Sequence, residues 1–367
     1  MPKVPYKKRK DGRYYKQIVY GYDENGKRKV KTFYDKDWRE LDKRVRNFQI
    51  ELDNGTYTDN DITLGECVQL WWKTKEDLSP STKYNYKGKL KTLDSIADIK
   101  LKDLKPRTIS QVLEYDCKSE KGAKEATIYT LLKSILNFAV KRELVNKNVI
   151  DKIDKPKMKL SKRRALTPEE KNAVETVIES DKLRQRSKAV IAILYYTGMR
   201  RNEMLSLKKS DINWEENYIY VKRTLSMTEN GKIYEKHCPK TTAGIRKIPI
   251  VPKLSNILKE YIEKLKAEEE YLFKTRYGTF ITNGNFAVIW ANIIKEINNC
   301  LGENEKIYIT PHYLRHNYAT ELIYAGVPLK TVQYIMGHEN INMTMNIYAD
   351  VRLDMDDVIS KLSKSMG

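Results

Sequence analysis

Side chains that could act together on a phosphate group occur close together near the end of the chain. His312 and Arg315 are three residues apart and therefore share one face of a helix. That helix begins at Pro311, because the Thr310 hydroxyl can accept from a free backbone N–H and proline lacks this donor. Apolar side chains recur at helical spacing on another face: Leu314, Tyr318 and Leu322. We therefore expect the face with His312 and Arg315 to point away from the core.

The next segment adds a second histidine and a tyrosine. A helix from Leu329 to Met336 ends at a glycine, His338 follows that glycine directly, and Tyr348 lies ten residues further on. Arginine offers a planar fork of donors to phosphate oxygens, imidazoles add hydrogen bonds or protons near neutral pH, and a phenol is a candidate nucleophile. A tyrosine on a helix is more often a packing residue, so only the ordered set favours a catalytic Tyr348.

Composition favours a polyanionic partner. The 367 residues are enough for two or three domains, and 69 Lys and Arg against 49 Asp and Glu give a formal charge of +20 at pH 7. Nucleic acid is the first candidate for such a chain. An anionic membrane is the alternative, but the N-terminal MPKVPYKKRK has no apolar signal-peptide core, and the apolar run near 189–196 is too short to span a bilayer. We expect a soluble, intracellular protein.

The four cysteines are scattered and include no pair at metal-ligand spacing: Cys67, Cys117, Cys238 and Cys300. This pattern predicts neither a zinc site nor a disulfide framework, and reduced thiols fit a cytosol. A catalytic thiol at Cys238 beside His237 is the alternative, although neighbours in a strand point to opposite faces. No Asp/Glu cluster with metal-ligand spacing surrounds the candidate residues, so we expect no metal.

Residues 1–56 have the pattern of a small sheet packed on one helix. Two stretches rich in aromatic and β-branched residues flank a turn signal at 23–26, and a helix over 37–52 follows. A β-ribbon fits the DNA major groove. We therefore expect its basic residues to contact DNA: Lys16, Lys27, Arg28, Lys29 and Lys31. The alternative is that these charges only keep a sheet edge soluble.

Residues 62–152 predict a compact bundle of four or five short helices. A capping box at Thr63–Glu66 opens the first helix, and later helices begin at Ser79–Pro80 and Lys105–Pro106. Lys83 and Lys87 are candidate phosphate contacts, although a lysine run is more often a solvated face.

Residues 153–165 have no apolar period and are strongly basic, which is typical of a linker between domains. Its basic residues Lys162, Arg163 and Arg164 are further candidate DNA contacts, and a cationic linker would let two DNA-binding modules close around a duplex.

Residues 166–367 predict a third and largest module. A capping box at Thr167–Glu170 opens it, helices follow to Tyr196, and a short helix is expected over 201–207. Strands are predicted at 217–223, 232–237 and 246–250. The break at Thr241–Gly244 predicts that the last two strands form a hairpin, with Lys240 at its tip or just before it.

This third module resembles the catalytic domain of tyrosine recombinases, the phage and conjugative-transposon integrase family. Several motifs occur in the family's order and together span most of residues 166–351, which makes the match specific. They are TGMRRNEMLSL (197–207), HCPKTTAGIRKIPI (237–250), PHYLRH (311–316), MGH (336–338) and NIYADV (346–351). The two N-terminal modules match the family only in their layout.

The resemblance implies a role for each matching residue. The Thr-Gly-x context selects Arg200, the first of two adjacent arginines, and Glu203 would brace its guanidinium. The Pro-Lys-Thr context selects Lys240, although other lysines lie near it. The remaining matches are His312 and Arg315 in the family's His-x-x-Arg, His338 in its Gly-His, and Tyr348 as the nucleophile.

The chemistry implied by the resemblance needs no cofactor. The tyrosine attacks a DNA phosphate and expels a 5′-hydroxyl, the arginines and histidines stabilise the transition state, and Lys240 protonates the leaving oxygen. Because the bond is stored as a 3′-phosphotyrosyl ester, neither ATP nor Mg²⁺ is required. A partner strand then attacks this ester, and two such rounds exchange strands through a four-way junction.

The resemblance also implies a fold and partners. We expect a multidomain chain, mainly α with small β-sheets: an arm-site DNA-binding domain, a helical core-site domain, and a mixed α+β catalytic domain with a tail helix. The partners would be double-stranded DNA at core and arm attachment sites, three further copies of the chain in a tetramer, and an accessory factor that sets direction. The element would be a phage genome or other mobile DNA, handled in the bacterial or host cytoplasm.

Two other functions fit part of the pattern. A type IB topoisomerase has a similar set of Arg, Lys, His and Tyr, but it relaxes supercoils by rejoining the same strand; the small basic N-terminal module argues against it. A non-catalytic DNA-binding protein would also be strongly basic. Tyr348 discriminates between these classes, because only an enzyme forms a covalent adduct through it.

Overall fold

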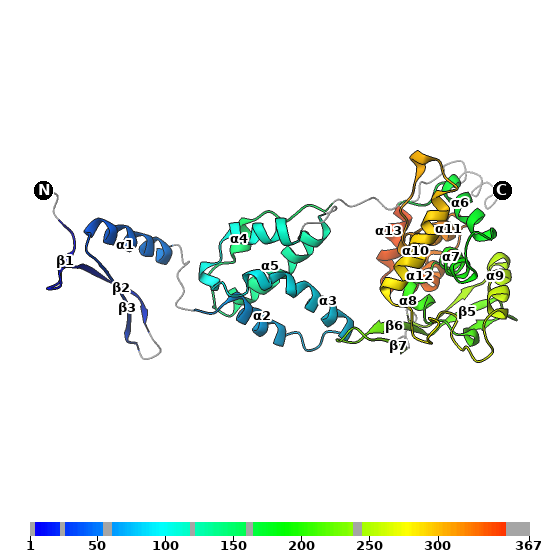
Figure 1. Cartoon of the computed structure of the whole chain (residues 1–367), viewed down its shortest axis with the longest axis horizontal. Coiled ribbons are helices and arrows are strands. Elements are labelled where there is room, and N and C mark those ends of the chain that lie inside the picture. The colour runs from blue at the N-terminus through cyan, green and yellow to red at the C-terminus, as the bar shows by residue number, and fades with distance from the viewer. Residues whose placement is uncertain are drawn as a thin grey trace, which may run out of the picture. The chain divides into compact units, whose positions relative to one another are not determined.

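The computed structural model describes residues 4–22, 26–53, 61–117, 122–158, 164–237 and 244–349, except the side chains of 304, 346, 348 and 349. The chain forms two compact units, Met1–Leu160 and Ser161–Gly367. Helices dominate both, and the strands form small sheets (Figure 1). The predicted fold class, mainly α with small sheets in several domains, is confirmed. Among the residues described, no helix is both long and apolar enough to span a membrane.

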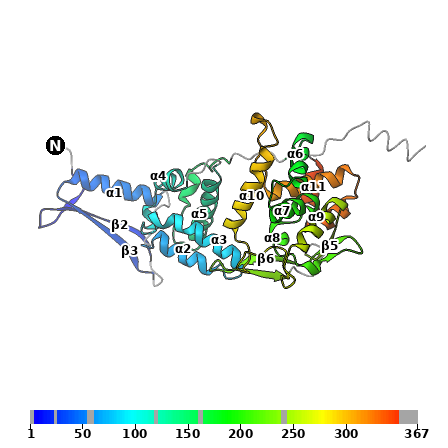
Figure 2. The same cartoon turned by 45° about the vertical axis from the view of Figure 1, so that its right-hand side comes forward.

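The first unit begins with an antiparallel sheet packed on one helix. Its elements are β1 (Lys7–Lys8), β2 (Tyr14–Tyr22), β3 (Arg28–Asp35) and α1 (Trp38–Asp53). The helix lies along the β2–β3 pair (Figure 2). Leu41 and Phe48 of α1 are buried against Ile18 and Phe33 of the sheet. This apolar cluster is separate from the one in the rest of the unit.

The remainder of the first unit is helical. It contains α2 (Leu64–Lys73), α3 (Pro80–Leu90), α4 (Pro106–Gln111) and α5 (Ala123–Lys141), with 3₁₀ turns at Lys91–Ile96, Leu101–Asp103 and Val149–Lys152 and a π turn at Val112–Asp116. The Thr63–Glu66 capping box is present: the Thr63 hydroxyl accepts from the Glu66 N–H, and the Glu66 carboxylate accepts from the Thr63 N–H. The bundle core includes Trp71 from α2 and Leu132 and Ile135 from α5.

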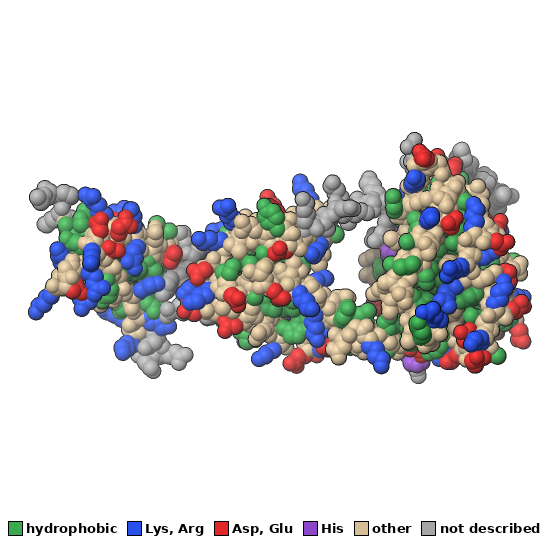
Figure 3. Space-filling view, in the orientation of Figure 1, with side chains coloured by type: hydrophobic (Ala, Val, Ile, Leu, Met, Phe, Trp, Pro, Cys, Tyr) green, Lys and Arg blue, Asp and Glu red, His purple; other side chains and the backbone are tan. Residues whose placement is uncertain are grey.

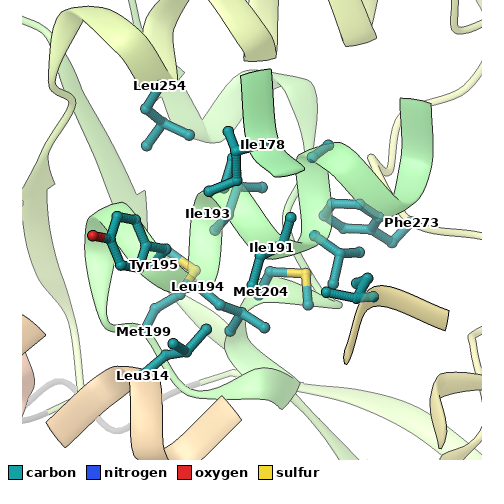
Figure 4. Close-up of a cluster of buried hydrophobic side chains, with 14 of the residues drawn as sticks. Ile178, Ile191, Ile193, Leu194, Tyr195, Met199, Met204, Leu254, Phe273 and Leu314 are labelled. Atoms are coloured by element: carbon teal, nitrogen blue, oxygen red, sulfur yellow. The ribbon is translucent and has the colours of Figure 1, made fainter. Parts of the chain in front are cut away.

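The second unit is organised around α7, which is buried along almost its whole length. Its helices are α6 (Pro168–Glu179), α7 (Gln185–Thr197), α8 (Arg201–Met204), α9 (Pro252–Glu263), α10 (Asn283–Asn298), α11 (Pro311–Tyr324), α12 (Leu329–Met336) and α13 (Ile341–Ala349). Ile191, Ile193 and Leu194 of α7 meet Leu254 of α9 and Leu314 of α11 in one core (Figure 4). A helix apolar on every side must be surrounded, and its neighbours α9, α10 and α11 surround this one.

The strands of the second unit form two small sheets. β4 (Ile212–Asn213), β5 (Tyr218–Val221) and β8 (Arg246–Pro249) form one antiparallel sheet, and β6 (Arg223–Met227) pairs with β7 (Ile233–His237) in the other. The prediction that the strands at 232–237 and 246–250 pair in a hairpin was therefore wrong. The hairpin partner of β7 is β6, joined through Asn230–Gly231, an overlooked hairpin turn signal.

α7 ends at a glycine that another helix approaches closely. Gly198 has φ +57°, the left-handed conformation typical of a helix C-terminus. A Cβ at this position would lie 2.6 Å from Cδ1 of Tyr318 on α11, which is too short for two carbon atoms that are not bonded to each other. Glycine therefore serves both the backbone turn and the packing of α11 against the end of α7.

Gly198→Ala is expected to lower the free energy of unfolding by about 2–5 kcal/mol, as measured by urea unfolding. The left-handed backbone contributes about 1–2 kcal/mol of this loss, and the overlap with Tyr318 adds about 1–3 kcal/mol. Gly326→Ala is the matched control, because Gly326 has φ +74° but nothing within 4 Å of an added Cβ. Equal losses in the two variants would contradict a steric role for Tyr318.

Candidate active site

Three arginines meet at the C-terminal end of α12. Its last carbonyls have no donor within the helix and carry the negative end of the helix dipole, so they attract cations. Each of three consecutive carbonyls accepts from a different guanidinium: Ile335 O from Arg246 Nε at 2.7 Å, Met336 O from Arg315 Nη2, and Gly337 O from Arg200 Nη2 at 2.7 Å. Residues from β8, α11 and the start of α8 are thereby brought to one point.

Arg315 is buried, contrary to the prediction that its helix face points away from the core. Its exposed fraction is 3%, and its Nη1 donates to the carbonyl of Gly198 at 2.9 Å. Burial, with the nearby charges of Arg200 and Arg246, lowers its pKa to about 9, so the guanidinium is still cationic at neutral pH. The prediction failed because the α12 terminus and the Gly198 turn cover this face and supply the acceptors that a buried guanidinium needs.

Arg200 is held by the helix that it begins. It is the N-cap of α8, where its backbone N–H donates to one carboxylate oxygen of Glu203 at 2.9 Å and its Nη1 donates to the other at 2.9 Å. Its side chain is 42% exposed. The two side-chain bonds described here use two of the five N–H donors of a guanidinium, which leaves capacity for a phosphate.

Glu203 is shared with Arg246, which the sequence analysis did not single out. Arg246 is fully buried and donates to both oxygens of Glu203, at 3.1 and 2.7 Å. Burial alone would raise the pKa of Glu203, but hydrogen bonding and charge from Arg246, with the charge of Arg200, lower it to about 2. The alternation of side chains along β8 is a sequence signal for the burial of Arg246. Arg246 and Ile248 share the inward face of the strand, whereas Lys247 is on the exposed face.

His338 lies directly after the α12 terminus and is 6% exposed. Its Nδ1 lies 2.9 Å from the hydroxyl of Thr344 on α13. Burial lowers its pKa to about 4, and the charges of Arg315, Arg200, Arg246 and His312 act in the same direction. The ring is therefore neutral at pH 7, with one nitrogen as donor and the other as acceptor.

Two other predicted residues lie near this point in the fold. His312 is exposed in the first turn of α11 and close enough to influence the pKa of His338. The backbone of Tyr348 belongs to α13, which packs on α11 and α12 (Figure 1) and buries Ile347 against Val332 and Met336. Lys240, between β7 and β8, lies outside the described residues, as does the tail helix.

The predicted DNA contacts have varied surroundings. The exposed ones are Lys16, Arg28, Lys29 and Lys31 in the sheet, Lys27 just before β3, and Lys87 on α3, while Lys83 is half-buried. Lys31 pairs across the sheet with Ile18, on the face that packs on α1, and its ammonium lies 4.6 Å from the ring centre of Phe48. On the face shown in Figure 3, Lys and Arg side chains are interspersed with Asp and Glu.

Arg164 in the predicted linker has a partner within its own unit. Both of its Nη atoms donate to the Glu170 carboxylate at 2.6 Å, and that carboxylate also caps α6 through the Thr167 N–H. Lys162 and Arg163 lie outside the described residues. In the part of the chain that the structure describes, no group of three or more His, Cys, Asp or Glu could hold a metal ion.

Parts of both compact units match known protein families. Residues 164–354 match the model of the phage integrase family, and residues 63–115 match the phage integrase N-terminal SAM-like domain. A protein named "Tyrosine recombinase XerC-like" from Caldanaerobacter subterraneus is 32% identical over 379 residues, covering 93% of this chain and 94% of the relative. The transposase from transposon Tn916 of Enterococcus faecalis is 29% identical, covering 71% and 68%.

Solved structures share the fold. The Tn1549 transposon integrase, solved with circular intermediate DNA, covers 83% of this chain with 99% of its own at 24% identity and a TM-score of 0.66. A lambda integrase tetramer, solved on a Holliday junction, covers 95% of this chain with 97% of its own at 19% identity and a TM-score of 0.56.

Arg246→Met is expected to lower the free energy of unfolding by about 3–5 kcal/mol, because it leaves the buried carboxylate of Glu203 without its principal partner. Urea unfolding of the full chain measures this loss. Lys247→Met is the matched control: the neighbouring lysine is exposed and pairs with the exposed Glu216, so its variant should unfold like the wild type. Similar losses of unfolding free energy in the two variants would contradict a stabilising role specific to the Arg246–Glu203 ion pair.

Proposed function

Because the chain belongs to the phage integrase family of tyrosine recombinases, we propose that it cuts and rejoins DNA at specific sites with Tyr348 as the nucleophile. The observation that carries this proposal is the convergence of Arg200, Arg315 and His338 at the end of α12, next to the helix on which Tyr348 lies. Cations held in fixed positions are what a pentavalent phosphate transition state requires.

The proposed reaction begins with attack of the Tyr348 oxygen on the scissile phosphate. A 3′-phosphotyrosyl bond forms as the bond to the 5′-oxygen breaks, and the 5′-oxygen leaves with a proton. Arg200 and Arg315 neutralise the non-bridging oxygens, while His312 and His338 donate hydrogen bonds. A free phenol has a pKa of about 10, so the surrounding cations must favour its ionised form during attack.

Lys240 is the proposed donor of the proton to the 5′-oxygen. The segment that contains it is attached at one end to β7 and at the other to Arg246, which is fixed to Glu203. An ammonium can both stabilise charge on the leaving oxygen and protonate it.

The remaining parts of the proposal concern DNA and assembly. The sheet-and-helix domain (1–56) would bind arm sites, the helical domain (62–152) core sites, and the catalytic domain (166–367) the cleavage point, with 153–165 as linker. Relatives include a transposon transposase, and the similar integrases were solved on DNA, one as a tetramer. We propose a mobile genetic element as substrate, a tetramer on DNA and an accessory factor for direction, in the bacterial cytoplasm.

Tyr348→Phe is expected to bind attachment-site DNA with wild-type affinity but to form no covalent adduct. A nicked suicide duplex, from which the cut end diffuses away, traps the adduct as a band that survives denaturing electrophoresis. Tyr324→Phe, at an exposed tyrosine on α11, is the matched control and should form the adduct normally. An adduct with the Tyr348→Phe protein would overturn the assignment of the nucleophile.

Lys240→Ala is expected to slow cleavage of ordinary DNA by about 10²–10⁴-fold, the usual contribution of a general acid. A substrate with a 5′-bridging sulfur at the cut should restore most of the rate, because a thiolate of pKa about 8.5 leaves without a proton. Lys236→Ala, at an exposed position of β7, is the control and should cleave both substrates normally. A Lys240→Ala defect that sulfur does not relieve would assign the proton to another group.

A further inference from the structure

The hydrogen bond between His338 and Thr344 connects the candidate site to the helix that carries Tyr348. Nδ1 of His338 lies 2.9 Å from Oγ1 of Thr344, and both residues are buried. Thr344 is on α13, four residues before Tyr348 and therefore one turn away on the same helix. The proposed nucleophile helix thus provides a hydrogen-bonding partner to a proposed catalytic histidine.

The backbone of His338 is fixed independently of α13. Its backbone N–H donates to the Gln333 carbonyl at 3.1 Å, and the Gln333 side-chain amide donates back to the His338 carbonyl at 3.0 Å. The glycine before it turns the chain with φ +63°. These contacts fix the backbone of His338 but leave its ring nitrogens unpaired, so the Thr344 hydroxyl can decide the orientation of the ring and which ring nitrogen carries the proton.

We propose that Thr344 is a positioning residue that selects the tautomer of His338: its hydroxyl donates to Nδ1, so that Nε2 carries the proton and can donate to a DNA phosphate oxygen. This inference rests on the proposed function. A neutral imidazole has one donor and one acceptor nitrogen, and an acceptor aimed at an anionic phosphate would repel it. Arg200 and Arg315 beside the ring already select for an anion at this point.

The arrangement makes the histidine depend on the nucleophile helix. While α13 is docked, through Ile347 and Thr344, the hydroxyl holds Nδ1 as the acceptor. When α13 leaves, the ring loses this partner and is free to place its proton on either nitrogen. A protomer whose tyrosine is not in place would then lack a correctly prepared histidine as well, so cleavage requires a docked α13 for two reasons instead of one.

Nitrogen NMR of the full chain tests the inference without reference to activity. The chain has only four histidines, so ¹⁵N-histidine labelling with one His→Gln variant per residue assigns every ring. At pH 7 the wild type is expected to show His338 with the proton on Nε2 and Nδ1 as an acceptor. A proton on Nδ1, which would mean that the Thr344 oxygen accepts, overturns the inference from the wild-type spectrum alone.

Substitutions supply the second readout. Thr344→Val should shift the His338 nitrogen signals toward a mixture of tautomers, and Thr344→Ser should restore the wild-type pattern. Thr320→Val is the matched control, because Thr320 is also buried in a helix but its hydroxyl donates to the His316 carbonyl. Unchanged His338 signals in Thr344→Val would also overturn the inference.

Cleavage kinetics separate this inference from the proposed function. On the suicide duplex, Thr344→Val should form the adduct about tenfold more slowly at saturating DNA, with unchanged DNA affinity, and Thr344→Ser should recover the rate. An unchanged rate in Thr344→Val would refute the catalytic consequence of the tautomer. By contrast, absence of any adduct in the wild type would refute the proposed function, while the nitrogen spectrum would still decide the role of Thr344.

Discussion

The candidate site depends on the attraction between the carbonyl end of α12 and three guanidinium groups. Arg200, Arg246 and Arg315 carry three positive charges, and the carboxylate of Glu203 neutralises one of them. Like charges about 4 Å apart repel by about 4 kcal/mol at the effective dielectric constant of a protein surface, so such a cluster needs compensation. The helix carbonyls supply part of it, and an anion bound at the site would supply more.

This compensation explains how the three guanidinium groups can lie together in the chain alone. Glu203 binds the guanidinium of the buried Arg246 through both oxygens and the guanidinium of the half-exposed Arg200 through one of them, so a single carboxylate sets the relation between β8 and the start of α8. Arg315 is fixed from the other side by the Gly198 turn. A transition state is stabilised most by donors that need not reorganise, and these guanidinium groups already have fixed partners.

The sequence predicted what local chemistry determines. Caps at Thr63, Thr167 and Thr310 are present in the structure, and the ordered motifs identified Arg200, Arg315 and His338 as residues that meet in space. It did not predict what depends on partners distant along the chain. The β6–β7 hairpin is a different case, because it is a local feature whose turn signal at Asn230–Gly231 was overlooked.

The burial of Arg315 and the role of Arg246 were missed because both depend on residues distant along the chain. Both follow from the packing of the α12 terminus, 21 residues from Arg315 and 89 from Arg246 along the chain. Helical periodicity places an arginine on the solvent face, because it carries no information about buried carbonyls of other elements that could accept from the guanidinium. Only the folded chain shows that the carbonyls of Met336 and Ile335 are those acceptors.

Under the proposed function, phosphate binding and delivery of the nucleophile fall to two different helices, α12 with its arginines and α13. Three arginines, two of them buried, connect α12 to other elements, whereas among the described side chains of α13 only Thr344 and Ile347 are buried. Ile341, Met343 and Met345 are exposed. Burying one isoleucine stabilises docking by about 1.5–3 kcal/mol, and a hydrogen bond adds about 1 kcal/mol. The three arginine bonds to the carbonyls of 335–337 do not involve α13, so under the proposed function the arginines would keep their positions whether or not the tyrosine helix is docked. The Thr344 hydroxyl would then hold the proposed tautomer of His338 only in the docked state.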